Sequence, residues 1–359
     1  MHLVMLMYGC IGVVASKNVL ESSKFSSVLV FGDSTVDPGN NNYLLTISKA
    51  NHFPYGIDFP GHVATGRFSN GKLVSDFLAS ALNIKDTVPP FLNPDLSDQE
   101  LLTGVSFASG ESGIDELTAS LTNVLSMDQQ LQYFKAYTMK LKQIVGEDQA
   151  MQRLRDALVL ISVGTNDFIL NFHDFPSRRL MFVTIDAYQD YLLDKLEVII
   201  KELYDEGCRN IGVAGLPPLG CVPLQMSLKF KIDRQCLVHQ NADSEKYNRK
   251  LAQRLSLLQA TLPQSKIVYG DLYHPLLNLY THPQHYELRN LIVHFSGRHV
   301  IDLASHSFIR YKEVNNKTRT PTLTFTEKRL ARFHFFMNNM MLLIEKLTME
   351  RPSQFYRSA

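Results

Sequence analysis

Ser34 has the sequence setting expected of a nucleophile. It ends the segment FGDS (31–34), which directly follows the apolar run SVLV (27–30). An apolar run that ends in Gly and polar residues is typical of a buried strand followed by a sharp turn. In an open α/β sheet, ligands bind at the carboxyl ends of the strands. We therefore expect the Ser34 hydroxyl at a binding edge, where it needs a base, usually a histidine oriented by a carboxylate.

Two further turns of the same kind follow apolar or small-residue runs. Gly110 closes the segment 104–110 (GVSFASG), and Asn166 follows the run 157–162 (ALVLIS). If these strands are parallel neighbours of the first, all three turns meet at one edge of the sheet. The backbone N–H groups of Ser34 and Gly110 and the side-chain amide of Asn166 could then stabilise an oxyanion. A glycine at position 110 would also let the backbone approach a substrate with no Cβ in between.

The elements that would position these turns alternate between strands and helices. Apolar runs predict further strands at 210–214 and 266–269, and apolar residues at helical spacing predict helices at 72–82, 186–203 and 242–258. Stretches rich in Gly, Pro and Asn predict loops at 37–43 and 51–71. Strands that alternate with helices of this length indicate an α/β protein whose parallel sheet is covered on both faces.

The composition favours a folded enzyme or binding protein over a nucleic-acid-binding one. The chain is 45% hydrophobic and 20% charged, which is enough to build a large core, and its formal net charge is +1. A chain this close to neutrality has little charge with which to neutralise phosphates, so we expect no nucleic-acid partner. The charge is uneven: residues 288–359 contain 12 Lys or Arg and 5 Asp or Glu, so this basic tail carries +7 and the first 287 residues carry −6.

Residues 1–16 resemble a secretory signal peptide. They are mostly apolar and end in small residues, although no Lys or Arg precedes the apolar stretch. The stretch is too short to span a membrane comfortably, and no other run reaches the roughly 20 apolar residues that a span needs. We therefore expect a secreted protein without a transmembrane segment. The alternative is a buried or frayed N-terminal segment.

The cysteines allow one disulfide in the mature protein. Cys10 would leave with the signal peptide. Cys221 and Cys236 lie in a Pro-rich, loop-like region and could be joined in an oxidising compartment, which would leave Cys208 as a buried thiol. The alternative is three reduced cysteines. No spacing of Cys and His resembles a zinc site, so we expect neither a metal nor another cofactor.

Six segments together resemble the plant GDSL esterase/lipases of the SGNH hydrolase superfamily. They are FGDS (31–34), DPGNNNY (37–43), PYGIDFPGHVATGRFSNG (54–71), GVSFASG (104–110), VGTNDF (163–168) and GLPPLGCVP (215–223). The resemblance covers about residues 27–287. It implies a three-layer α/β/α sandwich of flavodoxin-like topology, secretion, and hydrolysis of acyl esters or lipids through an acyl-enzyme. By position, it makes Ser34 the nucleophile and Ser34, Gly110 and Asn166 the oxyanion hole. We expect a monomer that acts on a small-molecule acyl ester or lipid.

The base is where the sequence departs from this family. The resemblance implies an Asp-x-x-His-Pro block that opens the last helix, and no such block follows Glu287. Asp271 and His274, which have the Asp-x-x-His spacing and follow a strand, could supply the acid and the base instead. The family usually has a different residue at the position of His274. The alternative is that His274 is a surface or helix-capping histidine.

The basic tail offers two alternatives. Residues 326–328 (TEK) and the amphipathic run after them resemble the start of a terminal helix at about 327–347, which would put Thr324 and Pro321 at the base and acid positions, where neither can act. The alternative that we favour is that the sequence after Glu287 is foreign to the family. Losing the base of a triad can cost on the order of 10⁶ in kcat. The alternative function is therefore a catalytically impaired protein of this fold that binds an acyl or glycan ligand.

The remaining histidines offer no clear base. His294, His299, His306 and His334 have no suitably spaced aspartate. His173 follows the Asn166 turn closely enough to line the mouth of the site, but we interpret it as a surface-loop histidine.

Overall fold

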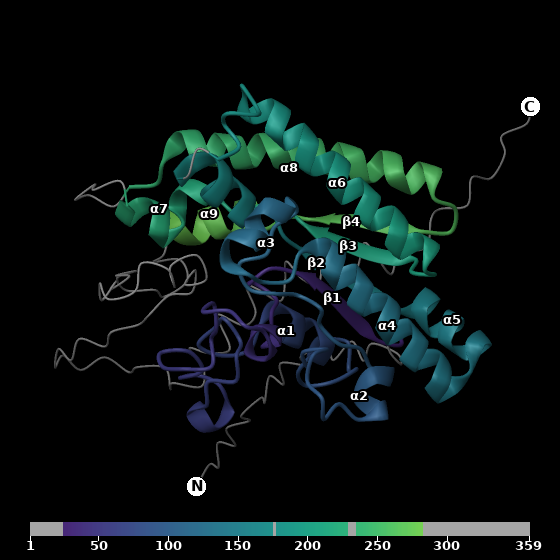
Figure 1. Cartoon of the computed structure of the whole chain (residues 1–359). Helices are drawn as coiled ribbons and strands as arrows, with labels where there is room; N and C mark the ends of the chain where they lie inside the picture. The colour runs from purple at the N-terminus through teal and green to yellow at the C-terminus, as the bar shows by residue number, and fades with distance from the viewer. Residues whose placement is uncertain (1–23, 175–176, 229–234, 283–359) are drawn as a thin grey trace, which may run out of the picture.

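The structure is a computed structural model that describes residues 24–174, 177–228 and 235–282 (Figure 1). The expected signal peptide, the basic tail with its terminal helix, and the positions Thr324 and Pro321 lie outside the described residues. Among the described residues, no helix combines the length and the apolar character needed to cross a membrane.

Four parallel strands form the centre of the protein, in the order β1-β2-β3-β4. They are β1 (Val28–Gly32), β2 (Leu158–Ser162), β3 (Asn210–Ala214) and β4 (Lys266–Gly270). These bounds lie close to those predicted from the apolar runs. In the register of the first pair, Gly32 lies opposite Ser162, so the last residues of β1 and β2 are neighbours.

An extended segment, residues 103–109, borders β1 on its other side. Phe107 donates its backbone N–H to the Val30 carbonyl at 2.7 Å, and Ser109 donates to the Gly32 carbonyl at 3.0 Å. The chain therefore leaves β1 to one side and later returns on the other side to form β2. This makes β1 the point at which the strand order reverses, which is where open α/β sheets bind their ligands.

Helices make up much of the remaining described chain. They are α1 (Val74–Ala81), α2 (Asp98–Leu102), α3 (Glu116–Thr122), α4 (Met127–Val145), α5 (Glu147–Asp156), α6 (Ile185–Asp205), α7 (Pro223–Leu228), α8 (Val238–Thr261) and α9 (Tyr273–Thr281). Short 3₁₀ turns occur at η1 (Asn40–Tyr43), η2 (Pro60–His62) and η4 (Leu219–Cys221), and a π-helix occurs at η3 (Asp167–Asp174). The predicted helices correspond to α1, α6 and α8. The sequence predicts no element for residues 111–156, where the structure has α3, α4 and α5.

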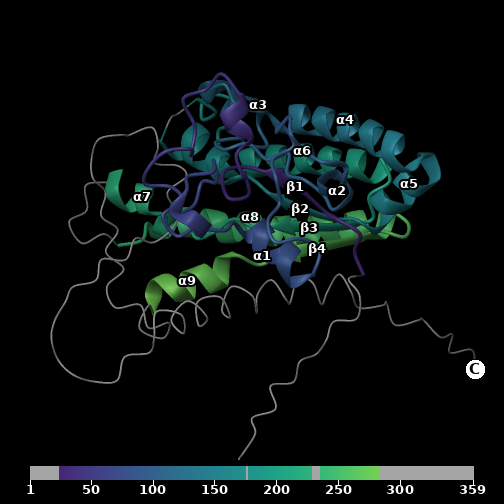
Figure 2. The same ribbon diagram turned by 90° about the horizontal axis from the view of Figure 1, so that it is seen from below.

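Helices pack against both faces of the sheet. Alternate strand residues such as Phe31 and Ile161 join a large core with residues of α4, α6 and α8. The residues between them, such as Val30 and Leu160, join a second core that includes Leu78 of α1. Figure 2 shows α4 and α6 on one side of the strands and α1 and α9 on the other. The predicted three-layer α/β/α sandwich with a parallel sheet is confirmed.

One disulfide is present in the described chain. It joins Cys221, at the end of η4, to Cys236, just before α8, with 4.4 Å between the Cα atoms. Cys208 is a buried thiol between α6 and β3, and burial raises its pKa to about 12. A thiol with such a pKa is protonated and unreactive at neutral pH.

Candidate active site

Ser34 lies in the turn that ends β1. Gly32 has φ +141°, and a Cβ there would lie 2.0 Å from the Ser162 carbonyl oxygen, so a glycine is required. Asp33 donates its N–H to that same carbonyl at 3.0 Å, and Val36 donates to the Asp33 carbonyl at 3.2 Å. The turn is therefore fixed against the end of β2, with Ser34 at its first corner.

The Ser34 hydroxyl has no hydrogen-bonded base among the described residues. Ser34 is 5% exposed. Within residues 24–174, 177–228 and 235–282, no side chain hydrogen-bonds to its Oγ, and this includes every histidine in those ranges. A serine nucleophile needs a proton acceptor, and none is hydrogen-bonded to Ser34 within these ranges.

Asp33 ties the nucleophile turn to β2. Its Oδ1 accepts hydrogen bonds from the N–H and the hydroxyl of Thr35, at 2.9 and 2.8 Å. The Thr35 hydroxyl also lies 2.8 Å from the Ser162 hydroxyl. Burial raises the pKa of Asp33 to about 6, against the opposing effect of the Thr35 hydrogen bonds. Asp33 therefore stabilises the turn through hydrogen bonds to Thr35, a residue of the same turn.

Asp37 joins the nucleophile turn to the Gly110 turn. Its Oδ2 accepts the backbone N–H of Gly110 at 2.8 Å, and its Oδ1 accepts the N–H groups of Gly39 and Asn40, each at 2.7 Å. Asp37 is completely buried, and burial raises its pKa to about 6 despite these bonds. The Gly110 N–H, which the sequence suggests as an oxyanion donor, is thus bound by a carboxylate of the protein.

The glycine at position 110 is required by Phe68. A Cβ at Gly110 would lie 2.3 Å from the Cζ atom of the Phe68 ring. Phe68 belongs to the long 51–71 loop, is 2% exposed and packs against Tyr55. The absence of a Cβ therefore makes room for a neighbouring ring, whereas the sequence suggests that it makes room for a substrate.

Two asparagines of the segment 37–43 hold the extended segment that leads to Gly110. Asn40 donates from its Nδ2 to the carbonyls of Ser106 and Ala108, at 2.9 and 2.8 Å. Asn41 donates to the Gly110 carbonyl at 3.0 Å. Both asparagines are completely buried. The predicted loop is thus a buried scaffold that fixes the second turn relative to the first.

Asn166 follows β2 and lies beside the same turns. It is 1% exposed, and its Nδ2 donates to the Ser112 carbonyl at 2.8 Å. An amide nitrogen carries two hydrogens. Because the described residues use one of them, the second can serve another acceptor.

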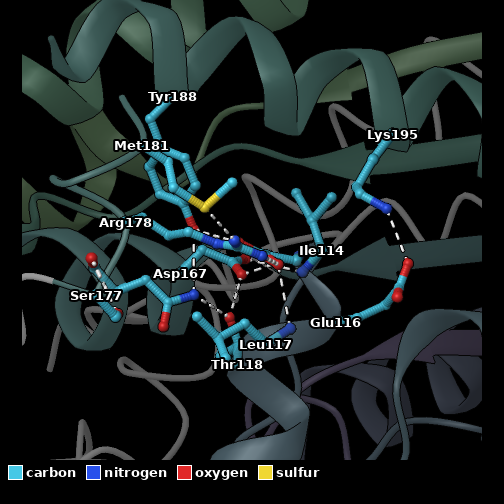
Figure 3. A network of polar contacts seen from close by, with 12 residues as sticks. Ile114, Glu116, Leu117, Thr118, Asp167, Ser177, Arg178, Met181, Tyr188 and Lys195 are labelled. Carbon is cyan, nitrogen blue, oxygen red and sulfur yellow. Dashed lines mark hydrogen bonds and ion pairs between the residues drawn. The ribbon is translucent and has the colours of Figure 1, made fainter. Parts of the chain in front are cut away.

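Asp167, the next residue, binds the loop that follows Gly110. Its Oδ2 accepts the Ile114 N–H at 2.8 Å, and its Oδ1 accepts the N–H of Asp115 at 3.0 Å and the hydroxyl of Thr118 (Figure 3). Burial raises the pKa of Asp167 to about 7. Asp167 thereby joins the Asn166 turn to the start of α3.

A buried ion pair completes this network. Arg178 donates to both carboxylate oxygens of Asp115, at 2.6 and 2.7 Å, and the Tyr188 hydroxyl lies 3.2 Å from the same carboxylate (Figure 3). Asp115 is completely buried, so its charge needs this bidentate partner. The network supports the loop beside Asn166.

Asp271 and His274 pair with each other at the start of α9. His274 Nδ1 lies 2.8 Å from Asp271 Oδ2, and Tyr273 donates its N–H to Asp271 Oδ1 at 2.9 Å. The His274 side chain is 72% exposed. This helix follows β4, three strand positions from β1, which corresponds to about 14 Å at the usual spacing of parallel strands. The structure therefore joins Asp271 to His274, and within the described residues neither side chain hydrogen-bonds to Ser34.

His173 is not a surface-loop histidine, which corrects the interpretation from the sequence. It lies in η3, and its side chain is 5% exposed. Its ring packs near Phe168 and Phe172, with centroids 6.5 and 5.9 Å apart. Its Nε2 lies 3.6 Å from the Asp243 carboxylate of α8. The sequence concealed this burial because the π-helix turns His173 toward α8.

Gln130 of α4 is a residue of the site that the sequence analysis missed. Its amide accepts the Gly32 N–H and donates to the Gly32 carbonyl, both at 2.9 Å, and it donates to the Ser112 hydroxyl at 3.2 Å. The signal in the sequence is a polar residue within an apolar helix face, formed by Met127, Leu131 and Phe134.

No group of three or more metal-ligating side chains occurs in the parts of the chain that the structure describes.

Comparison with known proteins gives a consistent set of relatives. A family model described as GDSL-like Lipase/Acylhydrolase matches residues 28–302. One GDSL esterase/lipase of Arabidopsis thaliana is 51% identical over 274 residues, which are 76% of each chain. A second from the same plant is 50% identical over 274 residues, again 76% of each chain, and a third is 48% identical over 297 residues, or 82% of each chain.

Proposed function

The chain belongs to the GDSL-like lipase/acylhydrolase family, and we propose that it hydrolyses carboxylic esters through an acyl-enzyme formed on Ser34. One observation carries the assignment of Ser34. The residue ends the strand at which the strand order reverses, and the turns of Gly110 and Asn166 follow the two segments that border this strand. A nucleophile at this position can reach a ligand bound at the carboxyl edge of the sheet.

The reaction would proceed in two steps. The Ser34 hydroxyl loses its proton to a base and attacks the ester carbonyl carbon, which forms a tetrahedral oxyanion. The oxyanion is stabilised by the Ser34 N–H and the second N–H of the Asn166 amide. The alcohol leaves with the proton that the base returns. Water then attacks the acyl-serine by the same route and releases the carboxylic acid.

Gly110 would have a supporting part in this oxyanion hole. Its N–H is bound by Asp37, so it can serve the oxyanion only by sharing its hydrogen or by exchanging one acceptor for the other. We therefore assign the main stabilisation to Ser34 and Asn166. The role of Gly110 is to keep the second turn close to the first.

The proton acceptor must be found by substitution. The candidates are His274, with Asp271 as its acid, and the histidines in residues 283–359, namely His285, His294, His299, His306 and His334. The position of His274 after β4 speaks against it. Exchanging each histidine for alanine in turn identifies the base as the single change that abolishes ester hydrolysis.

The same proposal covers the cellular setting. We propose a secreted monomer that acts on small-molecule acyl esters or lipids. Support comes from the disulfide between Cys221 and Cys236, because disulfides persist in oxidising compartments. Sequencing the N-terminus of protein recovered from a secreting plant cell would test cleavage near residue 16.

Hydrolysis of aryl esters of graded chain length tests the proposed activity. Ser34→Ala should reduce turnover to background. Asn166→Ala should lower kcat by about 10²–10³, because one oxyanion donor is lost. Asn51→Ala, at an exposed position, is the matched control and should leave kcat unchanged. A parent protein that binds but does not hydrolyse any of the esters, or a Ser34→Ala variant as active as the parent, would overturn the proposal.

A further inference from the structure

We propose that Gln130 is a positioning residue that holds the Ser34 turn and the Asn166 amide in one arrangement. This inference rests on the ester hydrolysis proposed above. Gln130 lies on α4, 98 residues along the chain from Gly32, and is completely buried. It touches neither Ser34 nor Asn166, so any effect on the chemistry acts through the residues that it binds.

The first link is to the end of β1. The Gln130 amide binds the N–H and the carbonyl of Gly32 together, each at 2.9 Å. The Gly32 carbonyl also accepts the Ser109 N–H at 3.0 Å. The side chain therefore acts as a strand neighbour for the last residue before the nucleophile turn. Two simultaneous bonds fix the direction of that peptide as well as its position.

The second link leads to Asn166. The other hydrogen of Gln130 Nε2 points to the Ser112 hydroxyl, at 3.2 Å. The Ser112 carbonyl accepts the Asn166 Nδ2 hydrogen at 2.8 Å. Ser112 is completely buried, so this chain of contacts is shielded from water. One amide group thus connects the nucleophile, through Gly32 and Asp33, with the oxyanion donor, through Ser112.

Gln130 suits this task because it carries no charge. The other buried groups that join these turns are the carboxyls of Asp33, Asp37 and Asp167, whose pKa values burial raises to about 6, 6 and 7. Those groups change charge within the range of ordinary assays. An amide keeps its three hydrogen bonds at every pH, so it can hold the turns while the carboxyls titrate.

The decisive variant is Gln130→Met, which has a similar volume and no hydrogen-bonding amide. A displacement of about 1 Å in a catalytic arrangement can cost about 10²-fold in rate. We expect kcat to fall 10- to 100-fold while KM stays within about twofold, because the substrate pocket keeps its shape. Ser112→Ala removes one of the two links and should give a smaller loss of kcat. The double variant should lose less than the product of the two single effects.

Leu141→Ala provides the matched control for stability. Leu141 lies on the same helix, eleven positions further along, and is 1% exposed. A cavity there should cost about 2–5 kcal/mol in the free energy of unfolding. It should leave kcat unchanged below the melting temperature. If Gln130→Met loses no more kcat than Leu141→Ala at comparable stability, Gln130 is merely structural and the inference is wrong.

Hydrogen exchange separates this inference from the proposed activity. In Gln130→Met, but not in Leu141→Ala, amide exchange should accelerate in residues 109–113 and 163–168. If Gln130→Met accelerates exchange in these residues but the parent protein hydrolyses no ester, the coupling stands and the proposed function is overturned. A parent with Ser34-dependent hydrolysis whose Gln130→Met variant keeps both its kcat and its exchange rates would overturn the coupling alone.

Discussion

The backbone N–H of Gly110 donates to the buried carboxylate of Asp37 at 2.8 Å. This bond joins two turns that are 73 residues apart in the chain. It makes the second turn depend on an ionisable group three residues after the nucleophile. The bond also distinguishes a structural role of Gly110 from a catalytic one, because a hydrogen held by a carboxylate is not fully available to a substrate.

Asp37→Asn should weaken both the fold and the catalysis. The amide oxygen can still accept from Gly39 and Asn40, but the amide nitrogen would then face the Gly110 N–H, so that two donors oppose each other. We expect a loss of about 1–3 kcal/mol in the free energy of unfolding and a fall in kcat larger than any rise in KM. Urea denaturation and steady-state kinetics measure the two effects. Asp95→Asn, at an exposed position, is the control, and equal behaviour of the two variants would contradict the role of Asp37.

Gly110→Ala should be destabilising because of Phe68. The new methyl group would lie 2.3 Å from the ring, and overpacking of a tight core typically costs about 1–3 kcal/mol. Pairing it with Phe68→Leu should recover part of that loss, since the smaller side chain vacates the space. Melting temperatures of the two single variants and the double variant form the test. Strictly additive losses would show that the methyl group and the ring do not meet.

The three turns could be predicted because their signals are local. Each is an apolar run followed by Gly, Ser or Asn, and the parallel sheet then brings their ends together. The partners that hold the turns could not be predicted in the same way. Asp37 and Gln130 meet their targets 73 and 98 residues away, and nothing in the local pattern says which backbone group a buried polar side chain will bind.

Gly110 and His274 show two further limits of prediction from the sequence. The need for a glycine at position 110 could be recognised from the sequence. The reason for it could not, because Phe68 lies in the 51–71 loop, whose path no periodic pattern of apolar residues indicates. The spacing of Asp271 and His274 correctly indicates a hydrogen-bonded pair. Spacing along the chain does not reveal which strand the pair follows in the sheet, and the sheet order places that strand three positions from β1.

His274→Ala should leave ester hydrolysis within about twofold of the parent, because β4 is three strand positions from β1. Loss of an essential histidine base costs on the order of 10⁶ in kcat in serine hydrolases, so the two outcomes are easily told apart. The exposed pair with Asp271 contributes at most about 1 kcal/mol to the free energy of unfolding. Steady-state kinetics with Ser34→Ala as the inactive reference decides the matter. Complete loss of activity would make His274 the base.

The disulfide should contribute substantially to stability. It closes a loop with a sequence separation of 15, for which the chain-entropy estimate is about 3 kcal/mol. Replacing Cys221 and Cys236 together by serine, or adding a reductant, should lower the urea midpoint accordingly. Cys208 should resist thiol reagents until the protein unfolds, because it is buried and its pKa is raised to about 12. An unchanged midpoint after reduction would contradict the stabilising role.

Asp167 should give the fold a measurable pH dependence. Burial raises its pKa from 3.8 to about 7, so the folded state binds the proton more tightly than the unfolded state does. The stability that this proton contributes is fully present below pH 4 and is lost as the pH rises through 7.

The variant Asp167→Asn isolates this effect, because the other titrating groups are common to both proteins. The free energy of unfolding of the parent minus that of Asp167→Asn should decrease between pH 4 and pH 7, by about 4 kcal/mol in total, and should level off above pH 8. The lost bond to the Ile114 N–H adds an offset that does not change with pH. Urea denaturation at intervals of half a pH unit gives the curve. A difference that grows with pH would mean that the bonds from Ile114, Asp115 and Thr118 outweigh burial and lower this pKa.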